Sequence, residues 1–457
     1  MKKIIFLELN EVPEKIFVKS LKDNKKIKLE NFVYNATISN DKGHLSPWTT
    51  WATIHRGVTD NEHGIIDINQ DTSKIDKKFP TLTSELIERG MKVGLFGSLH
   101  SGSISSKEFS KYKFLIPEVF ANYSKCKPKS LIPLQNLNLY MTRASARNVT
   151  RTFPPILILI KGILSYLRHV NDYKVLFRIL LHLLMELCRP WTKVRRRTIQ
   201  SLLMFDVFMN LIKKNNCDFS VFFTNHVAAN MHRFWEASFP EDYLNKVSNP
   251  EWTNKYKNEI GNSMEITNYF ISKLIEYIDS NRDFELWIAS SMGQAAVQDY
   301  KKELSYWHIE DMNTFLSSLC NEKVIVKELP QMIPHYGFQS DYETIKKIVH
   351  VIKNIQTNAQ LNIRSKTLTT LTFNFDTANI KKLIFTNKLD NKSINLKGLK
   401  NITIDEETGS SAYHIPKGIL YRYGNDIEKI DNKYLDSNGF LPTNKIREII
   451  INKFTEK

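Results

Sequence analysis

The sequence predicts an α/β fold with a doubly wound, mostly parallel sheet, a basic helical insertion and a small β-containing subdomain. Short apolar runs that end in polar residues alternate with helical patterns, which is typical of a parallel sheet flanked by helices. The 457 residues suffice for one large α/β domain with insertions, or for two domains. The apolar and charged fractions of 42% and 25% are those of a globular protein, so a disordered chain is not expected.

Four segments carry the strands on which this prediction rests. Residues 3–21 (KIIFLELNEVPEKIFVKSL) contain an apolar run, a polar turn and then a helical pattern. Residues 79–98 predict a helix followed by a second strand, and 217–227 and 284–294 predict a third and a fourth, each with polar residues after it. Because ligand sites in such folds lie beyond the carboxyl ends of the strands, these polar residues are the candidate site.

The first seven residues begin like a signal peptide, but acidic residues from Glu8 onward interrupt the apolar run and no small-residue cleavage site follows. We therefore interpret this segment as a buried strand and expect a cytoplasmic protein. No uncharged apolar stretch of about 18 residues is present, so a spanning helix is not expected. The cysteines have no CxxC spacing, which predicts free thiols in a reducing compartment; they are Cys126, Cys188, Cys217 and Cys320.

The net charge of +16 is concentrated in one region, residues 125–200. Between Lys125 and Arg197, fifteen Lys and Arg stand against two acids, Asp172 and Glu186. This balance favours an anionic partner. Nucleic acid is not expected, because no zinc finger, helix-turn-helix or basic-aromatic stacking motif is present.

Two apolar helices studded with Arg and Lys are expected within that region, in residues 153–170 and 173–197. The second has a stripe of residues four apart, widened by three leucines; these are Val175, Ile179, Leu183 and Leu187, then Leu176, Leu180 and Leu184. Cations that flank apolar helices are typical of helices lying on an anionic membrane, so residues 150–197 are the predicted membrane contact. The alternative is a pair of core helices in an inserted domain.

A second change in composition, to short alternating runs rich in Asn, Lys, Ile and Thr, occurs at 367–376 and 394–405. It predicts a small β-containing subdomain inserted before the last core segment. The predicted organisation, in chain order, is a first core segment (1–124), the basic insertion (125–200), a second core segment (201–310), the inserted subdomain (311–408) and a third core segment (409–457).

Five segments, in order, resemble the alkaline phosphatase superfamily and, within it, the type I phosphodiesterase/nucleotide pyrophosphatase branch. They are LELNEVP (7–13), TTWATIHRGVTDNEHGI (49–65), TNHVAANMHRFW (224–235), IASSMGQ (288–294) and AYHIPKGILYRYG (412–424). The resemblance implies an alkaline-phosphatase-like fold. It also implies two zinc ions held by Asp and His at strand ends, and a Thr or Ser that attacks phosphorus.

Most of the metal-ligand positions that the resemblance implies are replaced in this chain. The first Asp falls on Asn10, and the Asp-x-x-x-His pair falls on Ala228 and His232. The Ser-Asp-His-Gly turn falls on residues 290–293 (SSMG), and the last His is kept as His414. Two of six positions survive, His232 and His414. We therefore expect no metal or a single divalent metal, zinc being one possibility, and we do not expect a two-zinc site.

The nucleophile position is also altered. When the Trp, Gly and His-Gly-Ile residues of the second segment are matched to the family pattern, the nucleophile falls on Pro47, which cannot attack. Ser46 and Thr50 lie beside it and are the predicted catalytic hydroxyls.

Histidines accumulate in the segments expected to meet at the sheet edge. His226, which the family pattern lacks, precedes His232 by six residues. With His414, both follow predicted strands, so the three are predicted to be catalytic as acids or bases near neutral pH. The alternative is that histidines here bond the backbone and hold loops, which is the preferred interpretation for His63.

Polar and aromatic residues in the same segments are predicted to bind substrate. Arg233, beside His232, can form two parallel hydrogen bonds with a phosphate, and amide side chains can donate to a polar group. A Trp can stack on a ring, and a position in the core is the alternative for it. The set is Glu8, Asn10, Glu11, Trp51, Asn225, Arg233, Ser291 and Gln294.

The sequence thus predicts a remodelled enzyme of this superfamily, peripheral to the inner face of the cell membrane. It would act by hydrolysis or group transfer on a phosphorylated or anionic substrate that is membrane- or lipid-linked, such as an envelope glycan intermediate. Two alternatives stay open: a catalytically inactive binding protein, and a metal-independent transferase of surface polysaccharide assembly.

Overall fold

The computed structural model describes residues 2–22, 24, 27–43, 45–68, 70–101, 104–145, 154–404, 406 and 408–455. The chain forms two compact units. The larger comprises Met1–Tyr140, Pro154–Tyr300 and Ser410–Lys457, and the smaller comprises Met141–Phe153 and Lys301–Gly409. Of the predicted membrane contact, residues 150–153 lie outside the described residues.

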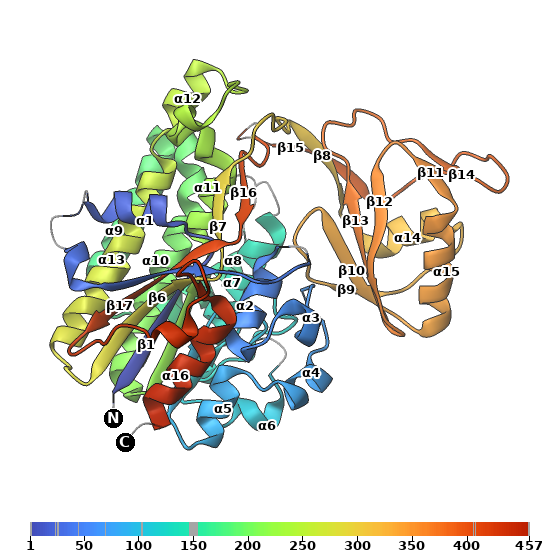
Figure 1. Cartoon of the computed structure of the whole chain (residues 1–457). Coiled ribbons are helices and arrows are strands. Elements are labelled where there is room, and N and C mark those ends of the chain that lie inside the picture. Colours follow the sequence, from blue (N-terminus) through green and yellow to red (C-terminus); the bar gives the residue numbers. More distant parts are fainter. Residues whose placement is uncertain are drawn as a thin grey trace. The chain divides into compact units, whose positions relative to one another are not determined.

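The larger unit is built on an eight-stranded sheet, whose order is β18-β2-β17-β6-β1-β5-β3-β4 (Figure 1). Only β17 runs against its neighbours β2 and β6, and every other pairing is parallel. The predicted doubly wound, mostly parallel sheet is therefore confirmed. The strands are β1 (Lys3–Leu9), β2 (Val33–Ile38), β3 (Val93–Phe96), β4 (Phe114–Ile116), β5 (Phe219–Thr224), β6 (Phe284–Ser290), β17 (Lys417–Gly424) and β18 (Leu441–Pro442).

The apolar run of β1 explains its position near the middle of the sheet. Its alternate side chains enter two different hydrophobic clusters, Ile5 and Leu7 on one face and Ile4 and Phe6 on the other. A strand covered by helices on both faces favours a continuous apolar run, and residues 4–7 of β1 form such a run ahead of Glu8.

Helices pack on both faces of this sheet. Those of the larger unit are α1 (Glu14–Lys22), α2 (Pro47–Arg56), α3 (Asp60–His63), α4 (Ser73–Lys78), α5 (Leu82–Glu88), α6 (Ser106–Phe109), α7 (Ile132–Ser145, which ends in the smaller unit), α8 (Ile156–Leu167), α9 (Tyr173–Cys188), α10 (Arg196–Asn215), α11 (His226–Ser238), α12 (Pro250–Tyr256), α13 (Glu259–Asp279) and α16 (Ile446–Thr455). Short 3-10 turns join them at Leu29–Asn31, Lys129–Leu131, Pro190–Arg195, Pro240–Asp242, Asn432–Tyr434 and Thr443–Lys445. A two-stranded ribbon of β7 (Gly293–Ala296) and β16 (Ala412–Ile415) completes the unit.

Of the predicted basic insertion, residues 125–140 and 154–200 belong to this unit. Helix α10 begins at Arg196, continues into the predicted second core segment, and buries Phe205 and Phe208 there in the cluster that covers one face of the sheet. Helices α8 and α9 precede it.

The smaller unit contains a four-stranded antiparallel sheet in the order β12-β13-β10-β9, with a separate hydrophobic cluster. Its extent, Lys301–Gly409, is close to the range predicted for the inserted subdomain. Its elements are β8 (Ser305–Ile309), α14 (Met312–Cys320), β9 (Lys327–Leu329), β10 (His335–Gln339), α15 (Tyr342–Lys353), β11 (Ile355–Thr357), β12 (Gln360–Lys366), β13 (Thr370–Asp376), β14 (Phe385–Asn387) and β15 (Leu399–Thr403).

None of the helices in the described residues of the chain combines the length and the apolar character needed to cross a bilayer. The four cysteines are unpaired, as predicted.

Candidate functional site

The candidate site begins where β1 ends at the carboxyl edge of the sheet. After Leu9, the chain continues through Asn10, whose N–H donates to Thr224 O of β5 at 3.0 Å, to Glu11. Glu11 has a φ of 59°, in the left-handed region that non-glycine residues rarely occupy. Such backbone strain costs about 1–3 kcal/mol and persists where the surroundings hold it, often at functional sites. The turn places the Glu11 carboxylate among side chains from three other elements.

Two histidines converge on this carboxylate. Glu11 Oε2 lies 3.0 Å from His232 Nε2 of α11 and 3.3 Å from His414 Nε2 of β16. The three ligand-type atoms all lie within 4.8 Å of one another. Glu11 is buried, whereas 24% of the His232 side chain is exposed, so the cluster has access to solvent on the His232 side.

The outer nitrogens of both imidazoles are fixed by the backbone. His232 Nδ1 lies 2.8 Å from Ala412 O, and His414 Nδ1 lies 2.7 Å from Leu45 O. A carbonyl oxygen only accepts, so each Nδ1 carries a proton and donates it. In the neutral imidazole, each Nε2 then holds a lone pair that faces the Glu11 carboxylate. Such a contact is favourable only if Nε2 is protonated or if a cation lies between the three atoms.

This arrangement fits one divalent cation. Histidines that ligate metals commonly donate their other N–H to a carbonyl or a carboxylate, as both do here. Ligand atoms at zinc bond lengths of about 2.0–2.2 Å in a tetrahedron lie about 3.3–3.6 Å apart, close to the observed spacing. Glu11, His232 and His414 form the one group of at least three His, Cys, Asp or Glu ligands found among the described residues. They therefore fit one ion but do not supply the ligands of two.

The charges of the cluster are strongly coupled. Burial by itself raises the pKa of Glu11, but the charges of His414 and His232 outweigh it, and this pKa lies far below its usual range. Burial lowers the pKa of His414, whereas the Glu11 carboxylate raises it, with a net rise. The carboxylate is therefore ionised at neutral pH, and a bound cation competes with the imidazole protons.

Two amide side chains orient the carboxylate. Asn10 Nδ2 donates to Glu11 Oε1 at 2.8 Å and to Asn225 Oδ1 at 2.7 Å. Gln294 Nε2 donates to Glu11 Oε2 and, at 3.2 Å, to Ala228 O. The register of the β7–β16 ribbon explains this contact, because Gln294 and His414 are directly opposed in it. Asn10 thus positions Glu11, and the carboxylate of the cluster comes from the residue that follows Asn10.

The predicted Trp51 lies in the core. Its Nε1 donates to Asn10 Oδ1 at 2.9 Å, and its ring is fully buried against Phe6. No face of the indole is open for a sugar or base to stack on, so this residue positions Asn10 and does not contact a ligand.

The predicted hydroxyls lie at the start of α2. Thr50 Oγ1 is 2.8 Å from Ser291 Oγ, and both residues are fully buried. Ser46 is the N-cap residue, and its side chain does not cap the helix. It directly follows Leu45, whose carbonyl oxygen accepts the hydrogen bond from His414 Nδ1. Pro47 begins the helix, as the sequence match indicated.

Three further predicted site residues do not join the cluster. His226 is buried, with Nδ1 2.7 Å from Thr224 Oγ1 and Nε2 3.1 Å from Ser263 O, a carbonyl of α13. Arg233 Nη1 donates to Ala229 O of its own helix at 3.0 Å. The structure therefore gives His226 a packing environment between helices instead of the predicted catalytic one.

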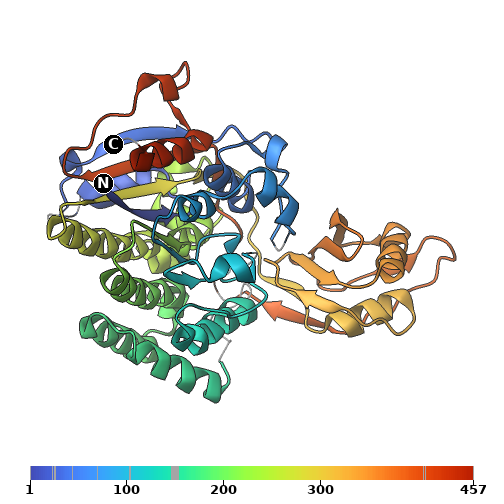
Figure 2. The ribbon, with the colours of Figure 1, turned by 90° about the horizontal axis from the view of Figure 1, so that it is seen from below.

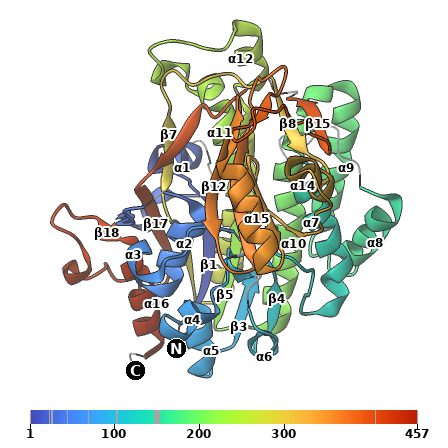
Figure 3. The same cartoon turned by 90° about the vertical axis from the view of Figure 1, so that its right-hand side faces the viewer.

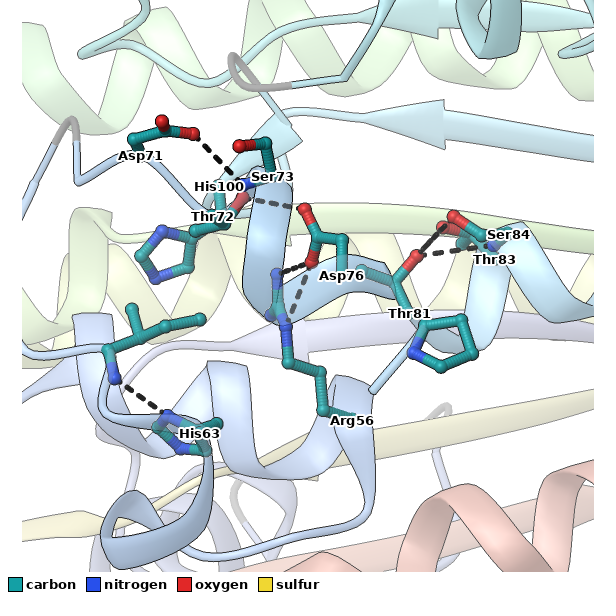
Figure 4. A network of polar contacts seen from close by, with 12 residues as sticks. Arg56, His63, Asp71, Thr72, Ser73, Asp76, Thr81, Thr83, Ser84 and His100 are labelled. Atoms are coloured by element: carbon teal, nitrogen blue, oxygen red, sulfur yellow. Dashed lines mark hydrogen bonds and ion pairs between the residues drawn. The ribbon is translucent and has the colours of Figure 1, made fainter. Parts of the chain in front are cut away.

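Glu8, the third, belongs to a second cluster, as strand alternation from Glu11 implies. Glu8 Oε1 lies 2.6 Å from His55 Nε2, which is also 3.1 Å from Ser98 Oγ. His55 and Ser98 line a small cavity together with Arg56 and Asp76. Figure 4 shows how this neighbourhood is tied together, with Arg56 Nη2 donating to Asp76 Oδ1 at 2.6 Å.

His63 also lies in this region of the unit and holds a loop. Its Nδ1 accepts from Ile65 N at 2.9 Å, and its Nε2 is 3.0 Å from Thr53 Oγ1. Burial lowers the pKa of His63 to about 4, so its imidazole is neutral. This agrees with the preferred interpretation of His63 as a structural residue.

Sequence reasoning predicted Glu11 as a substrate ligand and did not group it with the metal candidates His232 and His414. It also missed the carbonyls of Leu45 and Ala412, which fix the two imidazoles. A carboxylate next to the replaced Asp position was a visible signal for Glu11. The left-handed turn that brings it to the histidines was not visible in the sequence.

No protein-family model and no curated protein matches the sequence. The chain is similar to solved structures of phosphonoacetate hydrolase from Sinorhizobium meliloti (9% identity, TM-score 0.40, 99% of this chain and 96% of the other covered) and murine ectonucleotide pyrophosphatase/phosphodiesterase 5 (9%, 0.39, 99% and 95%). It is also similar to alkaline phosphatase from the Antarctic bacterium TAB5 (8%, 0.37, 99% and 98%). These three are members of the alkaline phosphatase superfamily, the family that the sequence motifs resemble.

Proposed function

We propose that this chain is a remodelled phosphoester hydrolase or transferase that holds a single divalent cation on Glu11, His232 and His414. The observation that carries the proposal is the convergence of one carboxylate and two Nε2 atoms whose imidazoles are already fixed through Nδ1. A cation bound there would polarise a phosphoryl oxygen and lower the pKa of a bound water. The order of the five family-like segments supports phosphorus chemistry.

Ser46 is the hydroxyl better placed to act on a bound group. Thr50 is fully buried and its hydroxyl is engaged by Ser291. Ser46 precedes the first turn of α2, where backbone N–H groups at a helix start favour an anion. A substrate phosphoryl group bound between this turn and the cluster would meet Ser46 or a water.

We further propose that the substrate is borne on a membrane, as a lipid-linked, phosphorylated intermediate of envelope glycan assembly at the cytoplasmic face. The basic, apolar helices of the same unit support a membrane-borne substrate. The negative charge of such a substrate fits the proposed site, because a bound cation and the start of a helix both attract negative charge.

A binding protein without catalysis is the second candidate. Four of the six ligand positions are replaced, and Pro47 stands at the nucleophile position. In that case, the cluster would bind an anionic group through imidazolium N–H donors and would need no cation.

Metal analysis of the purified chain, together with hydrolysis of bis-(nitrophenyl) phosphate with and without a chelator, tests the proposal. We expect about one zinc or other divalent ion per chain and turnover that the chelator abolishes. His232→Ala should lose the ion and at least about 100-fold in kcat/KM, because metal ligands and the groups that orient them typically contribute this much. His350→Ala, on the exposed face of α15, is the matched control and should change neither.

The outcomes separate the candidates. No bound ion and no turnover on this substrate or on lipid-linked sugars supports the binding protein. Two ions per chain, or no ion with chelator-insensitive turnover, would contradict the single-cation site. Ser46→Ala should lower kcat if the hydroxyl attacks and should leave it unchanged if water does.

A further inference from the structure

Helices α8 and α9 expose apolar side chains to an extent seen nowhere else in the described chain. Among its exposed large apolar residues, 14 of 25 fall between Ile156 and Leu187. We define the α8–α9 face by its six most useful markers, which are 51–79% exposed: Leu157, Leu164, Phe177, Leu180, Leu184 and Leu187. Exposed apolar surface of this extent marks a site of contact with another protein or with a membrane.

The inward side of α8 is small and polar. A Cβ on Gly162 would lie 2.6 Å from Leu137, so α8 approaches α7 closely there. Next to it, Ser165 Oγ donates to Ser130 O at 2.6 Å, and Tyr166 OH donates to Asp206 Oδ2 at 3.1 Å. The helix is thus held to the unit by polar contacts, while its leucines and isoleucines point outward.

The same inversion occurs in α9. It turns His182 and Glu186 inward, where His182 Nε2 lies 2.9 Å from Glu186 Oε1. Glu186 Oε2 also pairs with Arg196 Nη2 of α10 at 2.6 Å. In Figures 2 and 3, α10 lies between α9 and the central sheet, so α9 is the outermost helix on that side of the unit. In an ordinary surface helix, the leucines face the core and the polar side chains face water. Helix α9 has the opposite arrangement.

The charges around the face select the kind of partner. Exposed cations stand beside the apolar residues at Lys161, Arg168, Lys174 and Arg189. The two acids of residues 154–197 are both engaged, since Asp172 caps α9 through Lys174 N and Glu186 is buried with Arg196. A second copy docking here would set cations against cations, whereas an anionic bilayer complements them.

We propose that the α8–α9 face is a docking surface for an anionic lipid bilayer, with both helices lying in the plane of the interface. Their lengths of 12 and 16 residues suit this orientation, because a spanning helix needs about 20. Apolar side chains would enter the acyl boundary and the flanking cations would reach the head groups. The surface uses none of the residues of the Glu11 cluster, so it stands or falls separately from the proposed chemistry.

Flotation of the purified full chain with lipid vesicles tests this surface. Vesicles of phosphatidylcholine mixed with phosphatidylglycerol should carry the chain upward, and those of phosphatidylcholine alone should carry much less. The triple variant Leu164→Gln, Phe177→Gln and Leu184→Gln should bind at least about tenfold more weakly, since each buried apolar side chain contributes strongly to partition. All three side chains are exposed, so the fold should be kept, and circular dichroism checks this.

Two further variants separate charge from apolar contact. Lys161→Gln with Lys174→Gln should weaken binding to the anionic vesicles by about fivefold per cation removed, and added salt should have a similar effect. Leu244→Gln, at an exposed leucine elsewhere in the unit, is the matched control and should bind like the wild type. His232→Ala should also float normally, even if it has lost all activity.

Absence of wild-type flotation with anionic vesicles would overturn the proposal, as would unchanged binding of the triple variant. Sedimentation analysis of the same samples tests the other occupant. A wild-type dimer that the triple variant turns into a monomer, without vesicle binding, would show that the face joins two copies of the chain.

Discussion

Two glutamate–histidine clusters form at the end of β1, one on Glu8 within the strand and one on Glu11 just after it. They differ in their access to solvent. Glu8 pairs with His55, whose side chain is 7% exposed, and Ser98 supports the pair. Glu11 faces two histidines, of which His232 is 24% exposed. The first pair is closed from solvent, and the second is reachable from it.

The bonding of the histidines differs as well. In the Glu11 cluster, both Nδ1 atoms donate to backbone carbonyls, and the two Nε2 atoms and one carboxylate oxygen lie within 4.8 Å of one another. In the Glu8 cluster, a single Nε2 is shared between the carboxylate and a hydroxyl. Residue types alone therefore do not distinguish a structural pair from a ligand set, whereas the count of converging lone pairs and their solvent access do.

Among the changes that test this contrast, Glu8→Ala is expected to have the largest effect on the free energy of unfolding. Removing one partner of a buried pair leaves the other polar group without compensation, which typically costs about 3–5 kcal/mol in the free energy of unfolding. Urea denaturation measures it, and cation binding by the folded variant should stay intact. Glu276→Ala, at an exposed salt bridge of α13, is the control and should leave stability nearly unchanged. A neutral result for Glu8→Ala would remove the structural role of the closed pair.

The next effect concerns cation-dependent stability. Zinc at about 100 times its dissociation constant should raise the free energy of unfolding of the wild type by about 3 kcal/mol, because the ion binds only the folded site. Glu11→Gln should abolish this gain, whereas Glu8→Ala should keep it. Thermal unfolding with and without zinc measures the difference. An equal zinc gain in Glu11→Gln would show that the ion binds elsewhere.

The third effect is the pH dependence that His226 gives to stability. Burial lowers the pKa of His226 to about 4 in the folded chain, against about 6.5 when unfolded. The unfolded state therefore takes up the proton first, and stability is lost as the pH falls from about 6.5 toward 4, by about 2 kcal/mol at pH 5. Urea denaturation at pH 7 and pH 5 should show a smaller loss for His226→Gln than for the wild type. An equal loss in both would mean that His226 is not buried as a neutral imidazole.

The sequence by itself determined the strand–helix alternation and the position of His232 after a strand, whereas His414, predicted to follow a strand, lies within β16. These features depend on local periodicity, since continuous apolar runs such as that of β1 are stable only between helix layers. It also determined the excess of cations in α8 and α9, which is a matter of composition.

Only the tertiary structure decided which polar residues meet. The left-handed turn at Glu11 and the opposed register of Gln294 and His414 bring the cluster together, and both depend on contacts between residues distant in sequence. The packing of α11 against α13 likewise withdraws His226 from the site. In α9, a helix apolar on nearly every side, the inward side is the one that carries Glu186, which pairs with Arg196 of α10. Burial and pairing are properties of the folded neighbourhood, so no local pattern specifies them.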